Sequence, residues 1–481
     1  MGGGQRIEHH FTATLRECES WHRRDAYLNS ALKRMPLAQH VAYRKDSINT
    51  TQSEAPLARL RTNRPEPGRL RRLFAFLGPG LITGAADDDP SSVGTYCVVG
   101  AQLGTSILWS AFLTWPLIAA IQIVCARIGI VTGAGLAKAL GAKFPRPLVA
   151  IVALALLITN TITVGADLSA MADAAEMLSG VISHYYVVLF GVAIGLGTIL
   201  FRYRRIVNLL KWFALSLLAY VLTAFVVHPD WNAVLDETFL PTWPTGHAAW
   251  AGLVAILGAT ISPYLFFWQA SMGLEEMRDP HPVALFDGPE TATQRLSARR
   301  RDIGVGTLFS NLAMYFIILT TALTLHRNGV TNIDTTRDAA AALRPLAGSA
   351  AMTLFTIGIV GGGLVAIPTL ITSSAYALAE TFRWKDGLHR SFHAARPFYS
   401  VIILSILVGI VLDFTNVSPM KALYWSAVIN GLIAPFLLVG ILIVASDRKI
   451  MRQNPSPLLA RLMVGLAALA MFGAAIGMFA F

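Results

Sequence analysis

Apolar residues occur in long runs along most of this chain, and short polar segments separate the runs. Most runs reach the roughly 20 residues that a helix needs to cross a bilayer, and they are too uniform for amphipathic surface helices. The pattern therefore predicts an all-α polytopic membrane protein. We expect about eleven spans, at roughly 72–100, 104–127, 146–172, 184–201, 206–228, 248–276, 303–326, 349–380, 397–413, 419–446 and 457–480.

Polar residues and a proline interrupt two of these spans. Span 1 contains GAADDDPSS at Gly84–Ser92, and span 6 contains GATISPYLFF around Ser262-Pro263. Proline removes an amide donor and breaks helix hydrogen bonding, and irregular backbone at membrane depth is tolerated where it lines a cavity. Breaks five spans apart predict two five-helix halves in opposite orientation, with the substrate bound between the broken helices 1 and 6.

Composition and charge support a membrane protein and argue against a nucleic-acid partner. Of the 481 residues 54% are hydrophobic and only 14% are charged, whereas a soluble protein carries about 25% charged residues. The net charge of +11 resides in short basic clusters between apolar runs, which is the positive-inside pattern. We expect an integral protein of the bacterial inner membrane with a cytoplasmic N-terminus. Its partner is the lipid bilayer, and nothing implies an obligate protein partner.

The first 70 residues differ from the rest of the chain. They are polar, basic and rich in Arg, and they contain no apolar core of a secretory signal. We expect residues 1–70 to form a basic cytoplasmic extension, in part disordered, and residues 71–481 to form the transmembrane domain. The three cysteines are scattered, so they predict neither a disulfide framework nor a cysteine metal site.

Three consecutive carboxylates, Asp87, Asp88 and Asp89, occupy the break in span 1. A carboxylate at mid-membrane costs several kcal/mol and marks a functional site by default. A cation site is the natural explanation, and the alternatives are a structural acid paired to an Arg or a different span boundary. Asn160 and Asn430 also lie at membrane depth, where interhelical hydrogen bonding is the simpler interpretation and lining of an ion path the other. Close helix packing is the simpler interpretation of Gly361–Gly363.

Four segments together resemble the Nramp family of divalent-metal transporters, over roughly residues 72–480. They are GPGLITGAADDDPSSVGTYCVVGAQLGTSILW, ARIGIVTGAGLAKAL, GATISPYLFFWQAS and SDRKIM. The resemblance implies a LeuT-like 5+5 inverted repeat with broken helices 1 and 6, and a transported divalent metal ion. It implies no cofactor.

The chain departs from the family at the positions that bind the metal. The family's helix 1 motif Asp-Pro-Gly-Asn reads Asp89-Pro90-Ser91-Ser92 here, so the Asp is kept and Ser92 replaces the Asn. The helix 6 motif Met-Pro-His reads Ser262-Pro263-Tyr264, so the sulfur ligand and the His are both absent. The family's carbonyl ligand falls on Ala259. The resemblance thus implies an oxygen-only metal site of Asp89, Ser92, Ser262 and the Ala259 carbonyl, with Asp88 as a further ligand.

The departures also affect the groups that the family uses for proton movement. Its helix 3 motif Asp-Leu-Ala-Glu reads Asp167-Leu168-Ser169-Ala170, so one of two acids remains. Tyr264, with an ordinary pKa of about 10, is a poor proton carrier at neutral pH. Asp167, Tyr264 and Arg396, the basic candidate on helix 9, are the residues that we place on a proton or ion pathway.

These departures predict a transporter for Mg²⁺ or Mn²⁺ with weak or absent proton coupling, similar to the Nramp-related magnesium transporters. Oxygen ligands suit Mg²⁺, whereas a thioether favours softer ions. One alternative is a proton-coupled Mn²⁺/Fe²⁺ symporter in which Asp88 or Asp167 compensates for the lost groups. Others are an organic cation or amino acid transporter on the same fold and a non-transporting metal sensor. No catalytic motif is present, so we do not expect an enzyme.

Overall fold

The computed structural model describes residues 87–200, 218–278, 292–388, 390–415 and 418–481. Contacts within the chain divide it into two units, Met1–Leu70 and Arg71–Phe481. The first unit lies outside the described residues, so our interpretation of residues 1–70 stays a prediction. Within the described ranges the second unit is helical and contains no strand.

Nine helical segments of the described ranges are long and apolar enough to cross a membrane. One of them is the interrupted pair α13–α14, and the short helices α5 and α11 belong to two further predicted spans that extend into residues outside the description. The all-α, multi-pass prediction is confirmed. The helices are α5 (Pro90–Leu103), α6 (Trp109–Thr132), α8 (Arg146–Ser179), α9 (Ser183–Leu200), α11 (Leu218–Val226), α13 (His247–Thr260), α14 (Pro263–Arg278), α15 (Ala292–Thr324), α18 (Ala351–Phe382), α19 (Arg396–Asp413), α20 (Pro419–Ser446) and α21 (Leu458–Ala480).

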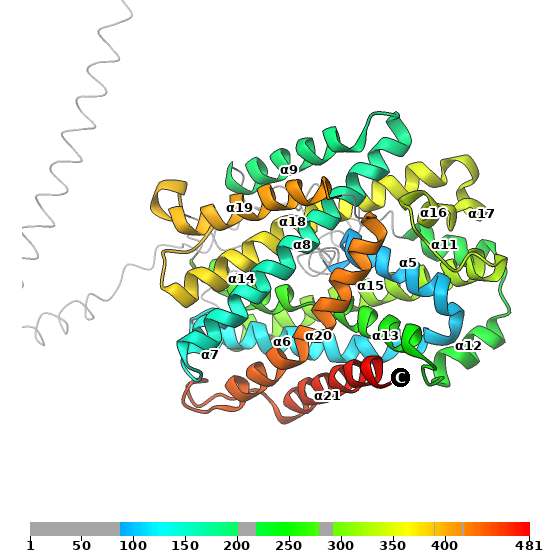
Figure 1. Ribbon diagram of the computed structural model, residues 1–481. Coiled ribbons are helices and arrows are strands. Elements are labelled where there is room, and N and C mark those ends of the chain that lie inside the picture. Colours follow the sequence, from blue (N-terminus) through cyan, green and yellow to red (C-terminus); the bar gives the residue numbers. More distant parts are fainter. Residues whose placement is uncertain (1–86, 201–217, 279–291, 389, 416–417) are drawn as a thin grey trace, which may run out of the picture. The chain divides into compact units, whose positions relative to one another are not determined.

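Short helices occupy the connections at the two ends of the bundle. Figure 1 shows α7 (Leu136–Gly141) at one end, and α12 (Trp231–Phe239), α16 (Thr336–Ala341) and α17 (Arg344–Ala347) toward the other. The remaining short pieces are 3₁₀ turns at Gly104–Ile107, His326–Asn328, Gly348–Ala350 and Phe392–Ala394.

Basic connecting segments meet at the α7 end. The ammonium group of Lys143 lies 2.7 Å from a carboxylate oxygen of Asp447, and this hydrogen bond holds the pKa of Asp447 below its ordinary value. The guanidinium of Arg452 donates to the carbonyl of Thr132 over 2.8 Å. The segments that follow α6 and α20 therefore share one end of the bundle, as the positive-inside pattern requires.

Small residues let the central helices approach closely. A Cβ atom added to Gly258 on α13 would lie 2.0 Å from the carbonyl oxygen of Ala427 on α20. On α18, a Cβ at Gly362 would lie 3.0 Å from the carbonyl oxygen of Asp88, and one at Gly363 would lie 2.2 Å from the sulfur of Met171. The prediction of close helix packing at Gly361–Gly363 is confirmed for these two glycines.

Asn160 ties α8 to α18 inside the bundle. Its side-chain amide donates to the carbonyl of Leu370 over 3.1 Å and to the hydroxyl of Ser374 over 2.9 Å. The interhelical interpretation of Asn160 is therefore confirmed, and the bond fixes α18 beside the helix that carries Asp167.

Candidate metal site

Asp89 forms the N-cap of α5, the helix that continues span 1 after its break. One of its carboxylate oxygens, Oδ1, accepts hydrogen bonds from the backbone amide of Ser92 over 2.6 Å and from the hydroxyl of Ser91 over 2.7 Å. Asp is a preferred N-cap because it satisfies free amides of the first turn, and Pro90 at the first helical position has no amide to satisfy. The sequence Asp-Pro-Ser-Ser thus starts a helix and fixes Asp89 at its end.

The second break falls between α13 and α14. Helix α13 ends at Thr260, residues 261–262 belong to neither helix, and α14 starts at Pro263. The hydroxyl of Ser262 lies within hydrogen-bond distance of two carbonyls of α13, at 2.9 Å from Gly258 and 2.8 Å from Ala259. Because the hydroxyl hydrogen points to the backbone, the lone pairs of the hydroxyl oxygen remain available to a metal ion.

The two breaks meet inside the bundle. The hydroxyl of Ser92 lies 3.4 Å from the carbonyl oxygen of Ala259, which also accepts the bond from Ser262. Asp89, Ser92, Ala259 and Ser262 are each at most 3% exposed. Four of the predicted ligands therefore gather where the broken helices meet, and they present oxygen atoms only.

Asp88 lies in a different arrangement from the other predicted ligands. The hydroxyl of Ser310, on α15, lies 2.9 Å from Oδ1 of Asp88 and 3.0 Å from Oδ2 of Asp87. Both carboxylates are 1% exposed. The structure thus groups Asp88 with Asp87 and α15, and it groups Asp89 with the break in span 6.

Asp167 and Tyr264 lie close to Asp89. Asp167, on α8, is fully buried, and its carboxylate interacts electrostatically with that of Asp89. Tyr264, in the first turn of α14, interacts with the charges of Asp89 and Asp167. These two predicted pathway residues therefore adjoin the candidate metal site.

Arg396 does not lie beside these two residues, and its role on a pathway stays a prediction. It is the exposed first residue of α19. Helix α8 contacts the other end of α19, where Gly165, two residues before Asp167, approaches Gly409. Gly409 lies 13 residues after Arg396, or about 20 Å along a helix. The sequence places Arg396 on a helix but does not say which end of that helix reaches Asp167.

Sequence reasoning missed Ser310 and Tyr96. Ser310 belongs to a Ser-Asn pair inside an otherwise apolar run, which is the signal that could have drawn attention to it. Tyr96 on α5 is fully buried and lies within the electrostatic influence of Asp87, Asp88 and Asp89.

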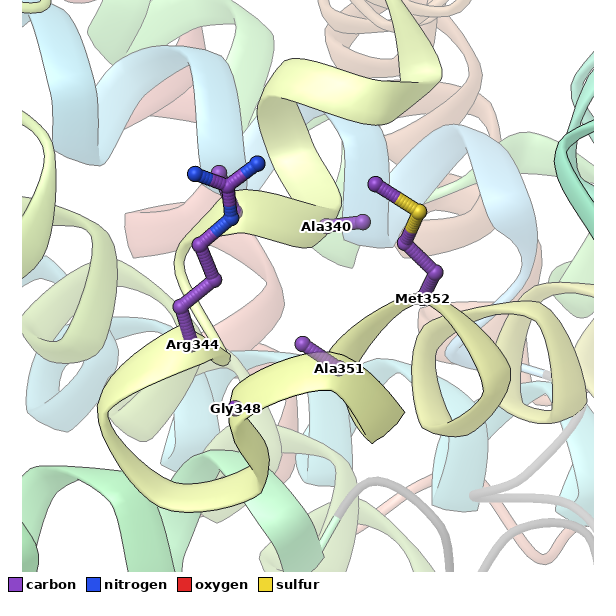
Figure 2. Close-up of a pocket in the computed structure, with 6 residues that line it drawn as sticks. Ala340, Arg344, Gly348, Ala351 and Met352 are labelled. Atoms are coloured by element: carbon purple, nitrogen blue, oxygen red, sulfur yellow. The ribbon is translucent and has the colours of Figure 1, made fainter.

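A cavity at the end of the bundle that carries α16 and α17 is a poor candidate for a metal site. Its volume is about 330 Å³, and Figure 2 shows Arg344 and Met352 beside it. Its wall contains a positively charged guanidinium and no carboxylate, so it repels a divalent cation. The residues that line it are Ala340, Ala341, Arg344, Gly348, Ala351 and Met352.

The described fold and site define a membrane transporter with two broken helices. Its fold matches the crystal structure of the Eremococcus coleocola manganese transporter with a TM-score of 0.66 at 17% identity, covering 86% of this chain and 87% of that one. It also matches Mhp1, a nucleobase-cation-symport-1 family transporter, with a TM-score of 0.53 at 17% identity, covering 84% and 92% of the two chains. The LeuT-like fold with broken helices 1 and 6 is therefore confirmed.

The amino-acid sequence identifies the family to which the chain belongs. The model of the Nramp family, described as natural resistance-associated macrophage protein-like, matches residues 80–480, and the chain belongs to that family. The divalent metal cation transporter MntH of Yersinia pestis (strain Pestoides F) is 28% identical over 311 residues, which are 61% of this chain and 70% of that protein. MntH of Chromohalobacter salexigens is 25% identical over 395 residues, 78% and 84% of the two chains.

Proposed function

We propose that this protein carries divalent metal ions across the membrane by alternating access, and that Mg²⁺, with Mn²⁺ as a second substrate, binds where the two broken helices meet. The observation that carries the proposal is the bond between Ser92 and the Ala259 carbonyl, beside Asp89 and Ser262. It joins two helix breaks and provides one carboxylate, two hydroxyls and one carbonyl. The relatives that are named divalent metal cation transporters support the same class of substrate.

The donor set favours hard cations. Mg²⁺ takes oxygen ligands and keeps several waters, so four protein oxygens with water in the remaining positions suit it. The family's thioether ligand is replaced by Ser262, which removes the preference for softer ions. Mn²⁺ also accepts oxygen ligands, so we expect it to bind in the same place.

We propose weak or absent proton coupling. Ala170 and Tyr264 stand where the family has an acid and a His for proton movement. A negative-inside membrane potential drives entry without protons, by about 4.6 kcal/mol for two charges across 100 mV. Asp167 favours the second candidate, proton-coupled Mn²⁺/Fe²⁺ uptake, because it is a fully buried acid beside Asp89.

Uptake into proteoliposomes tests the proposed site. With purified protein we expect uptake of Mg²⁺ and of Mn²⁺, and Asp89→Ala to lower both at least about 100-fold because the only carboxylate of the set is lost. Ser405→Ala on α19 is the matched control, since Ser405 is a buried serine on a different helix, and we expect it to leave both rates within twofold. Full uptake by Asp89→Ala would contradict the site.

We also propose a bacterial inner-membrane location with the N-terminus and the basic segments in the cytoplasm. The distribution of Lys and Arg supports this orientation. The contacts of Lys143 and Arg452 are consistent with it, because they join two basic segments at one end of the bundle.

A further inference from the structure

The carboxylates of the span 1 break do not converge on one ion. Among the described residues no three His, Cys, Asp or Glu side chains are arranged to hold a metal together. Asp89 bonds to the first turn of α5, whose Ser92 reaches the carbonyl of Ala259 in span 6, and Asp87 and Asp88 share the hydroxyl of Ser310 on α15. The break therefore contains two neighbouring groups of oxygen donors, and the charge of Asp89 acts on both acids of the second group.

No buried positive side chain among the described residues balances the carboxylates of Asp87 and Asp88. Asp87, Asp88, Asp89 and Asp167 are all buried, and no Lys, Arg or His is buried in the part of the chain that the structure describes. Buried carboxylates need a positive partner or a proton because desolvation of an unpaired charge costs several kcal/mol. Something that the described protein atoms do not provide must therefore balance these acids.

Two carboxylate oxygens of Asp87 and Asp88 also lack a hydrogen-bond partner among the described residues. The Ser310 hydroxyl has a single hydrogen, and two carboxylates lie within its reach. Oδ1 of Asp87 and Oδ2 of Asp88 have no partner among the described residues. Buried polar groups are normally satisfied, so these atoms point to a bound species.

We infer that Asp87, Asp88 and Ser310 form a second divalent-cation position next to the one at Asp89, Ser92, Ala259 and Ser262. The inference rests on the proposed function. The second position has two carboxylates and a hydroxyl, a hard oxygen set with room in its coordination shell for water, which Mg²⁺ and Mn²⁺ accept. Because both groups flank one helix break, an ion exchanges between them when the half-helices move.

Mn²⁺ binding to the purified full-length protein in detergent tests the inference. Electron paramagnetic resonance of a Mn²⁺ titration counts the bound ions, and spin–spin broadening reports two ions close together. We expect two Mn²⁺ per chain with broadened spectra. Asp89→Asn and the double variant Asp87→Asn/Asp88→Asn should each retain one ion and lose the broadening.

Ser310→Ala tests the second position without removing a charge. We expect it to raise the Kd of one Mn²⁺ at least tenfold and to leave the other unchanged, while Ser310→Thr, which keeps the hydroxyl, restores both. Thr321→Ala is the control, because Thr321 lies on the same helix and donates only to the helix's own carbonyls of Ile317 and Ile318. Size-exclusion profiles confirm that each variant is folded.

Two results would overturn the inference. A wild-type protein that binds one Mn²⁺, lost in Asp89→Asn and kept in the double variant, shows that Asp87 and Asp88 are balanced by a proton; the proposed function survives this result. Two ions that both persist in the double variant place the second ion elsewhere. Wild-type protein that binds no Mn²⁺ contradicts the inference and the proposed function together.

Discussion

At the scale of single residues, the chemistry of the site depends on one substitution relative to the family. Ser262 stands where the family has the soft thioether, and its hydroxyl bonds to the carbonyls of Gly258 and Ala259. A hydroxyl neither selects soft ions nor fills the volume of a Met side chain. We therefore propose that the side chain at position 262 sets the ion selectivity of this protein.

Ser262→Met provides the test at this scale. We expect the variant to take up Cd²⁺, a soft ion. Its rate of Mg²⁺ uptake should fall about tenfold, since a thioether replaces an oxygen and displaces water. A tenfold change corresponds to about 1.4 kcal/mol. Ser262→Ala, which adds no sulfur, should not gain Cd²⁺ uptake, and unchanged selectivity in Ser262→Met would show that position 262 does not face the ion.

The sequence predicts local features of the site better than its distant contacts. Pro90 and Pro263 mark both helix breaks, because proline acts on its own helix. Ser310 was missed because it contacts residues 222 and 223 positions away, which no local pattern reports. The distance of Arg396 from Asp167 could not be predicted for the same reason, since helix periodicity does not determine which end of a neighbouring helix a residue reaches.

At the scale of helices, the packing of α13 against α20 holds the broken span 6 in place. Gly258 precedes Ala259, whose carbonyl is one of the proposed metal ligands, and Gly258 touches the backbone of α20. The hydropathy pattern predicts both helices, but it does not predict that they pack together. That contact between distant segments is a property of the fold and became visible only in the structure.

Gly258→Ala tests this packing. A Cβ there would lie 2.0 Å from a backbone oxygen, so the helices must separate, and we expect a loss of about 1–3 kcal/mol of stability together with reduced uptake. Gly473→Ala on α21 is the matched control, since nothing lies within 4 Å of its Cβ position. Thermal unfolding in detergent measures both, and equal melting temperatures would contradict the close contact.

At the scale of the whole molecule, the orientation in the membrane is testable by labelling. In a cysteine-free background we expect a membrane-impermeant maleimide to label Trp243→Cys in intact cells and Arg448→Cys only after permeabilisation. Trp243 is 83% exposed in a connection without Lys or Arg, and Arg448 lies in a basic segment. Labelling of Arg448→Cys in intact cells would reverse the proposed orientation.

The central claim is that an oxygen-only site moves Mg²⁺ without protons, and one measurement tests it most directly. Proteoliposomes that hold the purified protein and an internal pH indicator are given Mg²⁺ or Mn²⁺ under a negative-inside potential. We expect Mg²⁺ entry with no internal acidification, at a rate independent of an imposed pH gradient. Entry of Mn²⁺ alone, with acidification of the lumen and no competition from Mg²⁺, would contradict it and would instead support proton-coupled transport through Asp167.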